Sequence, residues 1–550
     1  MRSLVNAFLI LCHLFFVNLC HKCIHSEIIK RLGPMMELED SGDSTTNHVH
    51  GLFSSKRDLQ SSNSSSIDFR PMRIYLDFSN VNTTDNETSS FITDVLTTEV
   101  VRRLSDFLMV NGTTTIPAFS KTSCDTLTQI PFSFSQKSTS ADLILLVGTI
   151  VEDSNYVAYA APCLINSLTK RPIVGAININ LKYLEVKKEK IEMNVSMIIH
   201  EVMHVLVLSP TLFSRFPIGQ QNVYVMENRN TTNGTTQVYK LITPGIIKVG
   251  KEHFGCDSFS GLYLENEGTK ASAGSHFEKV MTGNEIMTAQ ATGKMVISLW
   301  IMNLLNDSGW YKVNFDRQEP LYWGKNKGCG FLQNPCSNQF SEFCSTESAF
   351  SCSPDYTTKN RCVKTPFSDS CYVSEYLSGL NCNSDFVTLK TALYEERGAN
   401  SRCFETSVGS TKSVGCYIAS CTNGTLSMQV LNKKYTCSTS GEKISIDGLI
   451  VTCPDITDFC GKFKSKCEND CNANGKCLID SQCYCNYFTS GSSCGTPLNC
   501  TLGVDLCRAV ATSAAESGSD DSVIQNSSAQ VSVSLALIAT LFGVFYEAFL

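Results

Sequence analysis

The chain has 550 residues, a formal net charge of −7 and a pI near 5.8. That length is enough for roughly two to four domains with sizeable cores. The acidic balance leaves no large basic patch, which argues against nucleic acid as a partner. The chain has 27 cysteines, of which Cys12, Cys20 and Cys23 lie in the first 25 residues. The remaining 24 predict up to 12 disulfides and an oxidising compartment, rather than metal clusters in a reducing cytosol.

Both ends of the chain predict the secretory pathway. Arg2 precedes an apolar run from Ala7 to Cys20, so residues 1–20 are expected to be a signal peptide. Residues 501–530 form a polar linker, and residues 531–550 form an apolar tail that no Lys or Arg follows. This tail is either a GPI-anchor signal, with attachment between Ser517 and Ser528, or a C-terminal membrane helix. Either makes the membrane a partner of a surface protein. Glycosylation sequons agree, among them Asn82, Asn86, Asn111, Asn230, Asn233, Asn306 and Asn423.

The first part of the mature chain predicts an α+β or α/β core. Residues 21–69 are polar and serine-rich, typical of a propeptide or flexible leader, so we expect order to begin at the strand 73–79. The alternation of strands and helices that follows places a sheet against a long apolar helix. The expected elements are a helix over 92–108, buried strands over 142–150 and 173–181, and a helix over 195–208.

Beyond Cys329 the chain becomes rich in cysteine. We interpret residues 329–466 as a cysteine-rich domain stapled by disulfides. Residues 467–500 hold six cysteines spaced C-x3-C-x5-C-x5-C-x-C-x8-C up to Cys494, and the closing C-x-C-x8-C resembles an EGF-like module. The alternative is a structural spacer that continues the cysteine-rich domain.

The apolar segment 197–210 contains the motif His200-Glu-Val-Met-His204. Residues four apart share one helix face, so the two histidines can bind one metal ion. Glu201 lies about 100° round the helix, where its carboxylate can take a proton from water without being a ligand. This set of residues is typical of a zinc metalloprotease. The alternative, a buried helix with satisfied polar groups, is costly for two histidines and a glutamate on so apolar a segment.

A third ligand is required, and the residues leave several candidates open. In compact metzincins it lies six residues after the second histidine, but position 210 is proline. Downstream histidines are His253 and His276, and Glu265 or Glu267 could serve instead as a carboxylate ligand.

Several stretches, taken together, carry a family resemblance over roughly residues 70–500. The chain resembles leishmanolysin, a family of surface zinc metalloproteases of the metzincin type in which a long insertion precedes the third zinc histidine. In the family's order, the stretches are Tyr159-AAPC-Leu164, Arg171-PIVG-Ala176, His200-EVMH-Val205, Gly274-SHFEK-Val280, Asn284-EIMT-Ala289, Gly309-WYKVNF-Asp316 and Trp323-GKNKGC-Gly330. The resemblance implies a mixed sheet with an active-site helix in a catalytic subdomain over 70–209, and a central subdomain over 210–328.

The resemblance also implies roles for single residues. His200, His204 and His276 would be ligands of one Zn²⁺ ion, Glu201 the catalytic base, and Met287 the methionine of the turn beneath the site. Cys23, between His21 and His25, matches a cysteine switch that would hold the proenzyme inactive. The alternatives are an ordinary buried methionine for Met287 and an isolated cysteine near the signal-cleavage site for Cys23.

Val207 departs from the family, which has glycine there. Because valine tolerates positive φ poorly, we expect the helix to continue for another half-turn. We also expect the sequon at Asn194 to be unused. The sequence thus predicts a zinc-dependent endopeptidase acting on proteins or peptides, and does not fix the oligomeric state. The alternative is a catalytically inactive, protease-like surface adhesion or binding protein, which Val207 and the EGF-like spacing favour.

Overall fold

The structure, a computed structural model, describes residues 35–38 and 69–498, apart from 113–114, 154–155, 232–233, 268–273, 334–335, 348, 383–392, 399 and 464–466. The predicted signal peptide, most of the leader with Cys23, the polar linker and the apolar tail lie outside the described residues. A stretch from Lys188 to Phe213 is long and apolar enough to cross a membrane, but 89% of its most apolar part is buried inside the protein. We therefore interpret it as a core helix.

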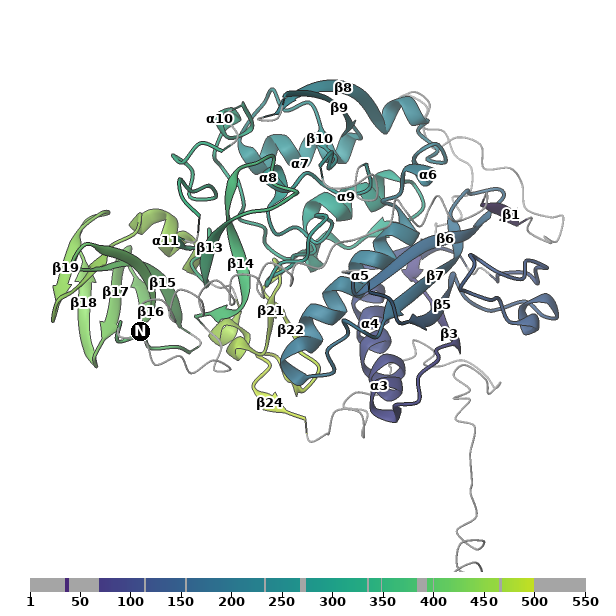
Figure 1. The fold of residues 1–550 in the computed structure, drawn as a ribbon, viewed down its shortest axis with the longest axis horizontal. Coiled ribbons are helices and arrows are strands. Elements are labelled where there is room, and N and C mark those ends of the chain that lie inside the picture. Colours follow the sequence, from purple (N-terminus) through teal and green to yellow (C-terminus); the bar gives the residue numbers. More distant parts are fainter. Residues whose placement is uncertain are drawn as a thin grey trace, which may run out of the picture. The chain divides into compact units, whose positions relative to one another are not determined.

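A five-stranded mixed sheet forms the centre of the first part of the chain, with strand order β1-β6-β7-β5-β3 (Figure 1). Strands β3, β5 and β7 are parallel neighbours, β6 runs antiparallel to β7, and β1 runs parallel to β6. The apolar runs correctly predicted β5 and β7, because strands covered on both faces are continuously hydrophobic. The alternating pattern correctly predicted β3. The strands are β1 (Met36–Leu38), β3 (Ile74–Asn80), β5 (Leu143–Ile150), β6 (Ala158–Asn166) and β7 (Pro172–Asn180).

Helices α4 (Thr97–Phe107) and α5 (Ile191–Leu206) cover one face of this sheet (Figure 1). α4 continues from α3 (Asn86–Ser90) and η1 (Phe91–Leu96), so the helix predicted over 92–108 is confirmed. Gly175 of β7 allows α5 to approach closely, since a Cβ there would lie 2.3 Å from Cγ1 of Val205. This glycine therefore sets how near the helix with the HExxH motif lies to the sheet.

The other face of the sheet is covered by the loop segment 115–141, which contains η2 (Phe132–Ser135). Phe119 and Phe134 stack in this layer, and the Cys124–Cys163 disulfide ties the loop to β6. Strand β6 is thus fixed by pairing with β1 and β7 and by a covalent bond to the loop on its face.

The central part of the chain packs against the same core as α5. Its strands β8, β9 and β10 form a small sheet of order β10-β9-β8, and its strand β11 joins β4 and β2 of the first part of the chain in a sheet of order β11-β4-β2. The elements are β2 (Phe69–Pro71), β4 (Leu108–Asn111), α6 (Pro210–Phe213), η4 (Gln220–Asn222), β8 (Tyr224–Thr231), β9 (Gly234–Leu241), α7 (Pro244–Phe254), β10 (Leu262–Tyr263), α8 (Lys279–Thr282), α9 (Leu299–Asp307), β11 (Lys312–Val313), η5 (Phe315–Arg317) and α10 (Cys329–Gln333).

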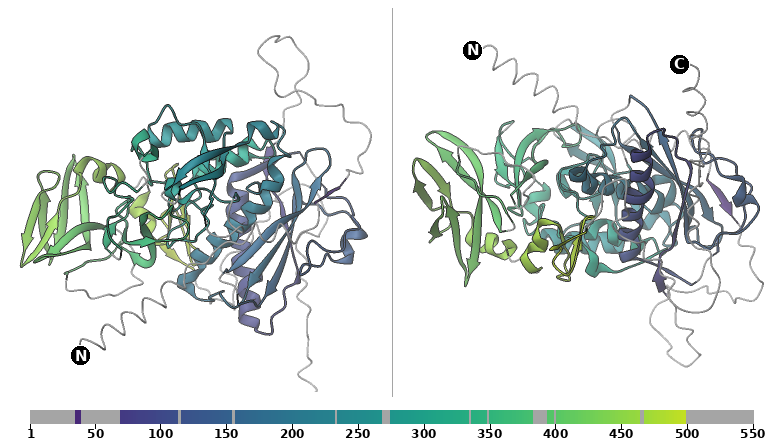
Figure 2. Two further views of the ribbon diagram at one scale, coloured as in Figure 1. Left: turned by 45° about the horizontal axis from the view of Figure 1, so that its top comes forward. Right: turned by 90° about the horizontal axis from the view of Figure 1, so that it is seen from below.

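The C-terminal part is held by disulfides, as predicted, and it also contains antiparallel sheets that the sequence did not predict. A three-stranded sheet has the order β12-β13-β14, and a six-stranded sheet has the order β18-β17-β16-β15-β20-β19, drawn in green in Figure 2. The elements are β12 (Phe350–Cys352), β13 (Thr358–Lys364), β14 (Tyr372–Asn381), β15 (Ser401–Val408), β16 (Thr411–Thr422), β17 (Thr425–Val430), β18 (Lys433–Cys437), β19 (Lys443–Ile446), β20 (Leu449–Thr452), α11 (Ile456–Phe463), η6 (Glu468–Ala473), β21 (Gly475–Cys477), β22 (Cys483–Cys485), β23 (Thr489–Ser490) and β24 (Thr496–Pro497).

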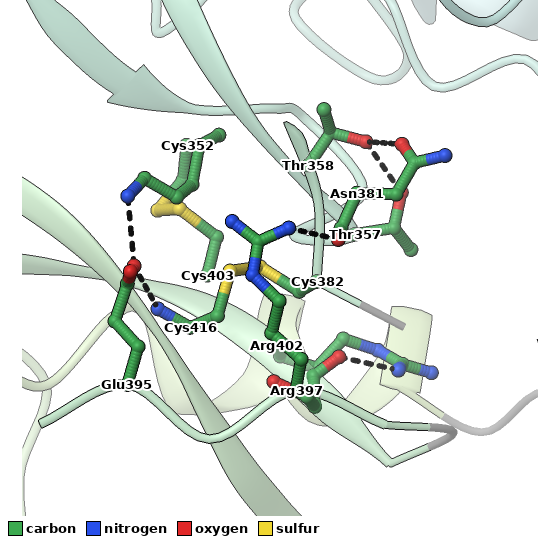
Figure 3. The surroundings of a disulfide bond; sticks show 12 residues. Cys352, Thr357, Thr358, Asn381, Cys382, Glu395, Arg397, Arg402, Cys403 and Cys416 are labelled. Atoms are coloured by element: carbon green, nitrogen blue, oxygen red, sulfur yellow. Dashed lines mark hydrogen bonds and ion pairs between the residues drawn. A yellow bond between two sulfur atoms is a disulfide. The ribbon is translucent and has the colours of Figure 1, made fainter. Parts of the chain in front are cut away.

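Eleven disulfides join described cysteines, and nine of them lie entirely beyond residue 335. Figure 3 shows two of them side by side. Cys403 and Cys416 face each other across β15 and β16, and bond to Cys352 and Cys382 respectively. The β21–β22 hairpin is held by three further bridges, Cys467–Cys477, Cys471–Cys483 and Cys485–Cys494. Oxidation of these cysteines agrees with the predicted oxidising compartment.

Two expectations about local structure are wrong. Order does not begin at residue 73, because β1 and β2 precede it. The helix with the motif runs over Ile191–Leu206, so it begins earlier than predicted and does not continue past Val207. Val207 instead has φ −155° and ψ −45°, so its φ is negative and does not lie in the left-handed region that favours glycine. The chain therefore turns after Leu206 without needing glycine.

Candidate metal centre

The structure brings three predicted histidines together. His200 and His204 lie on one face of α5, and His276 lies between β10 and α8. All three are buried, and one ring nitrogen from each lies within 4.8 Å of the others. The ring of His204 is almost perpendicular to the other two, at 86° to each, while His200 and His276 are nearly parallel at 17°.

Hydrogen bonds fix the protons of the two histidines on α5. Nδ1 of His200 donates to the carbonyl of Ile286 at 2.6 Å, and Nδ1 of His204 donates to the carbonyl of Leu208 at 2.8 Å. A carbonyl only accepts, so Nδ1 carries the proton in both rings and Nε2 offers its lone pair when the ring is neutral. Burial lowers the pKa of His200 to about 4, which keeps that ring neutral at physiological pH.

The donor set therefore fits a metal ion. The Nε2 atoms of His200 and His204 lie 3.1 Å apart, where two lone pairs repel unless a cation lies between them. Two nitrogen ligands of one tetrahedral zinc ion are separated by about 3.3 Å. Imidazoles that donate their second N–H to a backbone carbonyl are the usual arrangement of metal-binding histidines.

Glu201 lies next to His200 on α5 and is buried to 5% exposure. Its Oε2 accepts a hydrogen bond from the backbone N–H of Ala160 at 3.2 Å. Because Ala160 belongs to β6, this bond holds the carboxylate between the histidines and the antiparallel strand of the sheet. The site is thus built from one helix, one strand and the segment that carries His276.

Comparison with known proteins identifies the family of this chain. Residues 83–365 match the model of the peptidase family M8, leishmanolysin. The chain belongs to the leishmanolysin family. The family is one of peptidases, and the three histidines of this chain are able to bind a metal ion.

Similar proteins support the family assignment and show how much of each chain the similarity covers. The chain is 26% identical over 414 residues to a leishmanolysin-like peptidase of Drosophila pseudoobscura pseudoobscura, covering 56% of this chain and 60% of the relative. It is 26% identical over 423 residues to a leishmanolysin-like peptidase of Caenorhabditis elegans, covering 56% and 64%. It is 24% identical over 368 residues to leishmanolysin of Leishmania tropica, covering 58% and 54%. The chain thus spans less than two thirds of each of these relatives.

A tight turn underlies the centre of this leishmanolysin-family chain. The carbonyl of Met287 accepts from the N–H of Phe277, next to His276, while the preceding carbonyl of Ile286 accepts from His200. Met287 itself is fully buried. One short backbone segment therefore orients two of the three histidines, which gives the predicted Met-turn a physical role here.

Sequence reasoning missed Glu285 in this turn. Its carboxyl accepts hydrogen bonds from the N–H of Met287 and, at 3.0 Å, from Oγ of Ser298. Burial raises the pKa of Glu285 to about 8. The signal was present in the quoted Asn-Glu-Ile-Met-Thr stretch, where an acidic residue stands in an otherwise buried segment.

The other predicted ligand candidates lie elsewhere. His253 belongs to α7 and its Nε2 bonds the carbonyl of Trp323 at 2.7 Å, so it is a core histidine. The backbone N–H of Glu265 donates to the carbonyl of His276, and among the described residues neither Glu265 nor Glu267 belongs to the histidine group. Cys23 lies outside the described residues. A groove of about 1340 Å³ passes the first turns of α5, but none of the three histidines lines it.

Proposed function

We propose that the protein is a zinc-dependent endopeptidase, made as a proenzyme and presented on the cell surface. The observation that carries this proposal is the convergence of three imidazoles whose orientation is set by backbone carbonyls, with a buried glutamate beside them. His200, His204 and His276 would hold the ion. Three neutral nitrogen donors are a typical ligand set for catalytic zinc.

Zinc bound there would lower the pKa of a water ligand and polarise a peptide carbonyl. Glu201 would act as the base that removes a proton from the attacking water and then delivers it to the leaving amine. The N–H of Ala160 orients that carboxylate through its 3.2 Å hydrogen bond. The turn at Ile286 and Met287 keeps His200 and His276 in place, so little reorganisation is needed during the reaction.

The remaining predictions follow from the sequence. We propose a propeptide over residues 21–69 with Cys23 as the switch, catalytic and central subdomains over 70–328, a cysteine-rich domain over 329–466 and an EGF-like module over 467–500. The three disulfides of the β21–β22 hairpin support the last of these. Residues 531–550 would anchor the protein to the membrane, and its substrates would be proteins or peptides.

Metal content and peptide turnover test this proposal separately. The leader-free protein should hold one zinc ion per chain, lose it in His276→Ala and keep it in the matched His253→Ala, whose histidine lies outside the centre. A quenched generic peptide should be cleaved by the wild type and by Glu252→Ala, an exposed glutamate on α7. Glu201→Ala should reduce turnover at least about 1000-fold, since it removes the proton acceptor. Folded, zinc-loaded protein without turnover would favour the adhesion alternative.

A further inference from the structure

The segment that carries the third histidine is bonded to a strand of the cysteine-rich domain. Three residues after His276, the Nζ atom of Lys279 lies 2.9 Å from Oε2 and 3.2 Å from Oε1 of Glu375 on β14. The two side chains are buried to 1% and 7% exposure. Among the described residues, Glu375 is the only carboxylate that pairs with Lys279. A buried ammonium close to a metal-binding histidine is thus neutralised by one residue of another domain.

The neighbouring residue Glu278 is linked to the same part of the chain through Arg229 of β8. The Arg229 guanidinium donates to Oε2 of Glu278 at 2.8 Å and pairs with Oδ2 of Asp369 at 2.6 Å. Asp369 lies three residues before β14, and its backbone N–H donates at 2.6 Å to the carboxylate of Glu267. Both charged residues that follow His276 therefore connect to residues 369–375.

Strand β14 also contacts the chain beyond the Met-turn. The backbone N–H of Gly293 donates to the carbonyl of Tyr376 on β14 at 2.8 Å. Cys371 and Val373, at the start of this strand, are buried in the same core as Met287. The strand is therefore bonded to the chain on both sides of the Met-turn, at Lys279 before it and at Gly293 after it.

Helix α8, which begins at Lys279, depends on its side-chain contacts for its position. It has four residues, too few for a helix to be stable through its own hydrogen bonds. Nε1 of Trp323 donates to the carbonyl of Val280 at 3.1 Å, and a Cβ at Gly283 would lie 2.2 Å from Cδ2 of the same tryptophan. The helix is thus packed closely against Trp323, and the pair with Glu375 fixes its first residue.

Loss of the charge on Glu375 would leave the Lys279 ammonium in the core without a counter-charge, which is strongly unfavourable. To reach water, this side chain has to leave the core, and α8 begins with the same residue. A shift of Lys279 is passed back along three residues to His276. Contacts outside the ligands typically change metal affinity about 10- to 100-fold, because they set where the ligand atoms lie before the ion binds.

We propose that Glu375 is a positioning residue for the third metal ligand. Through Lys279 it fixes the start of α8 and thereby the position of His276, so that the cysteine-rich domain completes the metal centre. Glu375 lies beyond residue 365, where the match to the family ends. The nature of the ion rests on the proposed function, while the ion pair and its burial stand on the structure alone.

Metal titration tests this role without any turnover. The full chain with its leader cleaved would be freed of metal and titrated with Zn²⁺ against a chromophoric chelator, and with Co²⁺ to record the visible absorption of the centre. Glu375→Gln keeps the shape of the side chain and removes its charge, so zinc affinity should fall about 10-fold and the cobalt absorption should change. Glu375→Asp keeps the charge one methylene shorter, and should weaken zinc binding by only about threefold.

The cysteine-rich domain offers a matched control in the buried pair Lys359–Glu395, whose Nζ and Oε1 atoms lie 2.7 Å apart with side chains 9% and 2% exposed. Glu395 lies beside the two neighbouring disulfides (Figure 3). Glu395→Gln removes the same charge from an equally buried pair, so it should lower Tm as Glu375→Gln does. It should leave zinc affinity and the cobalt absorption unchanged, which separates positioning of the ligand from stability of the domain.

Two outcomes would overturn the positioning role: zinc affinity of Glu375→Gln equal to that of the wild type, or an equal loss of affinity in Glu375→Gln and Glu395→Gln. A protein that cleaves generic peptides and shows either outcome would retain the proposed function and lose this role for Glu375. A protein that binds zinc with the expected dependence on Glu375 and cleaves nothing would do the reverse. A wild type that binds neither ion would refute both.

Discussion

The close approach of α5 to the sheet makes a prediction about both stability and metal binding. Gly175→Ala places a methyl group 2.3 Å from Cγ1 of Val205, far inside van der Waals contact. Val205 is fully buried and follows His204, so relief of the clash must displace the C-terminal turn of α5 or distort β7. Overpacking of this kind costs about 1–3 kcal/mol. We expect zinc affinity to fall about 10-fold as well, because displacement of His204 disturbs the convergence of the ligands.

The matched compensating change is Val205→Ala. It removes two buried methyl groups and should by itself cost about 1.6 kcal/mol, plus a contribution for the cavity. In the double variant the new methyl group occupies space that the valine has left, so its total cost should be at least about 1 kcal/mol smaller than the sum of the single costs. For a chain of this length, each kcal/mol corresponds to about 1 °C in Tm, within reach of calorimetry.

Additive effects of Gly175→Ala and Val205→Ala on Tm would contradict this prediction. If the two single effects on Tm simply sum in the double variant, the methyl group at 175 does not meet Val205, and the helix is not held at the distance described. Isothermal titration with zinc supplies the second readout. Affinity that is lost in Gly175→Ala and restored in the double variant would tie the packing of this glycine directly to the metal centre.

Three further predictions concern other parts of the molecule. Glu285→Gln should flatten the pH dependence of stability, because the folded protein holds a proton on Glu285 up to its pKa of about 8 and the unfolded chain loses it near 4.5. In the wild type only, the free energy of unfolding should therefore fall by up to about 1.4 kcal/mol per pH unit between these two values. Urea unfolding with chelator present would measure this. Removal of the Cys124–Cys163 disulfide by a double change to alanine should lower the free energy of unfolding by about 4 kcal/mol, because the bond closes a loop of 39 residues, and an unchanged Tm would contradict this. Glycopeptide mapping should find Asn306 or Asn423, both exposed, modified and Asn194 unmodified, since its side chain is buried and donates to the carbonyl of Glu185; a glycan on Asn194 would contradict the packing at the start of α5.

The elements that the sequence predicted share a physical signature. β5 and β7 are apolar on both faces because helices cover one side of the sheet and the 115–141 loop covers the other. α5 is apolar around nearly its whole circumference, so its few polar residues indicated a functional site rather than a solvent-exposed face of the helix. Such signals depend only on neighbours along the chain, and a single sequence contains them.

The leader strand and its ion pairs gave no such signal. β1 has three residues, too few for alternation to be distinguished from chance. Its contacts are also remote along the chain, since Glu37 pairs with residues 133 and 178 positions away. A polar, serine-rich context therefore predicted a flexible leader, while long-range pairing with an open sheet edge orders this part of it. Composition describes the average polarity of a segment and does not identify the few residues in it that pair with a distant strand.

The prediction about Val207 failed for a different reason. It assumed that the chain leaves the helix through positive φ, because the family has glycine at that position. Here both Val207 and Leu208 donate to the carbonyl of Met203, and Leu208 accepts from His204. The end of the helix is thus set by hydrogen bonds that include the metal-binding side chain itself. A residue that lacks access to positive φ still permits the turn, so the substitution gives no reason to doubt the centre.

The third histidine shows what spacing can and cannot decide. His253 is nearer to the motif in sequence than His276, yet it lies on α7 and bonds Trp323. What distinguishes His276 is its backbone: Phe277 pairs in parallel with Thr288 and bonds the carbonyl of Met287, while Ile286 in the same turn bonds His200. The ligand is selected by a backbone that meets the turn, not by distance from the helix. The closeness of Gly274-SHFEK-Val280 to Asn284-EIMT-Ala289 carried that information in the sequence. The ten residues between His276 and Met287 are enough for the chain to fold back and too few for the two residues to lie far apart.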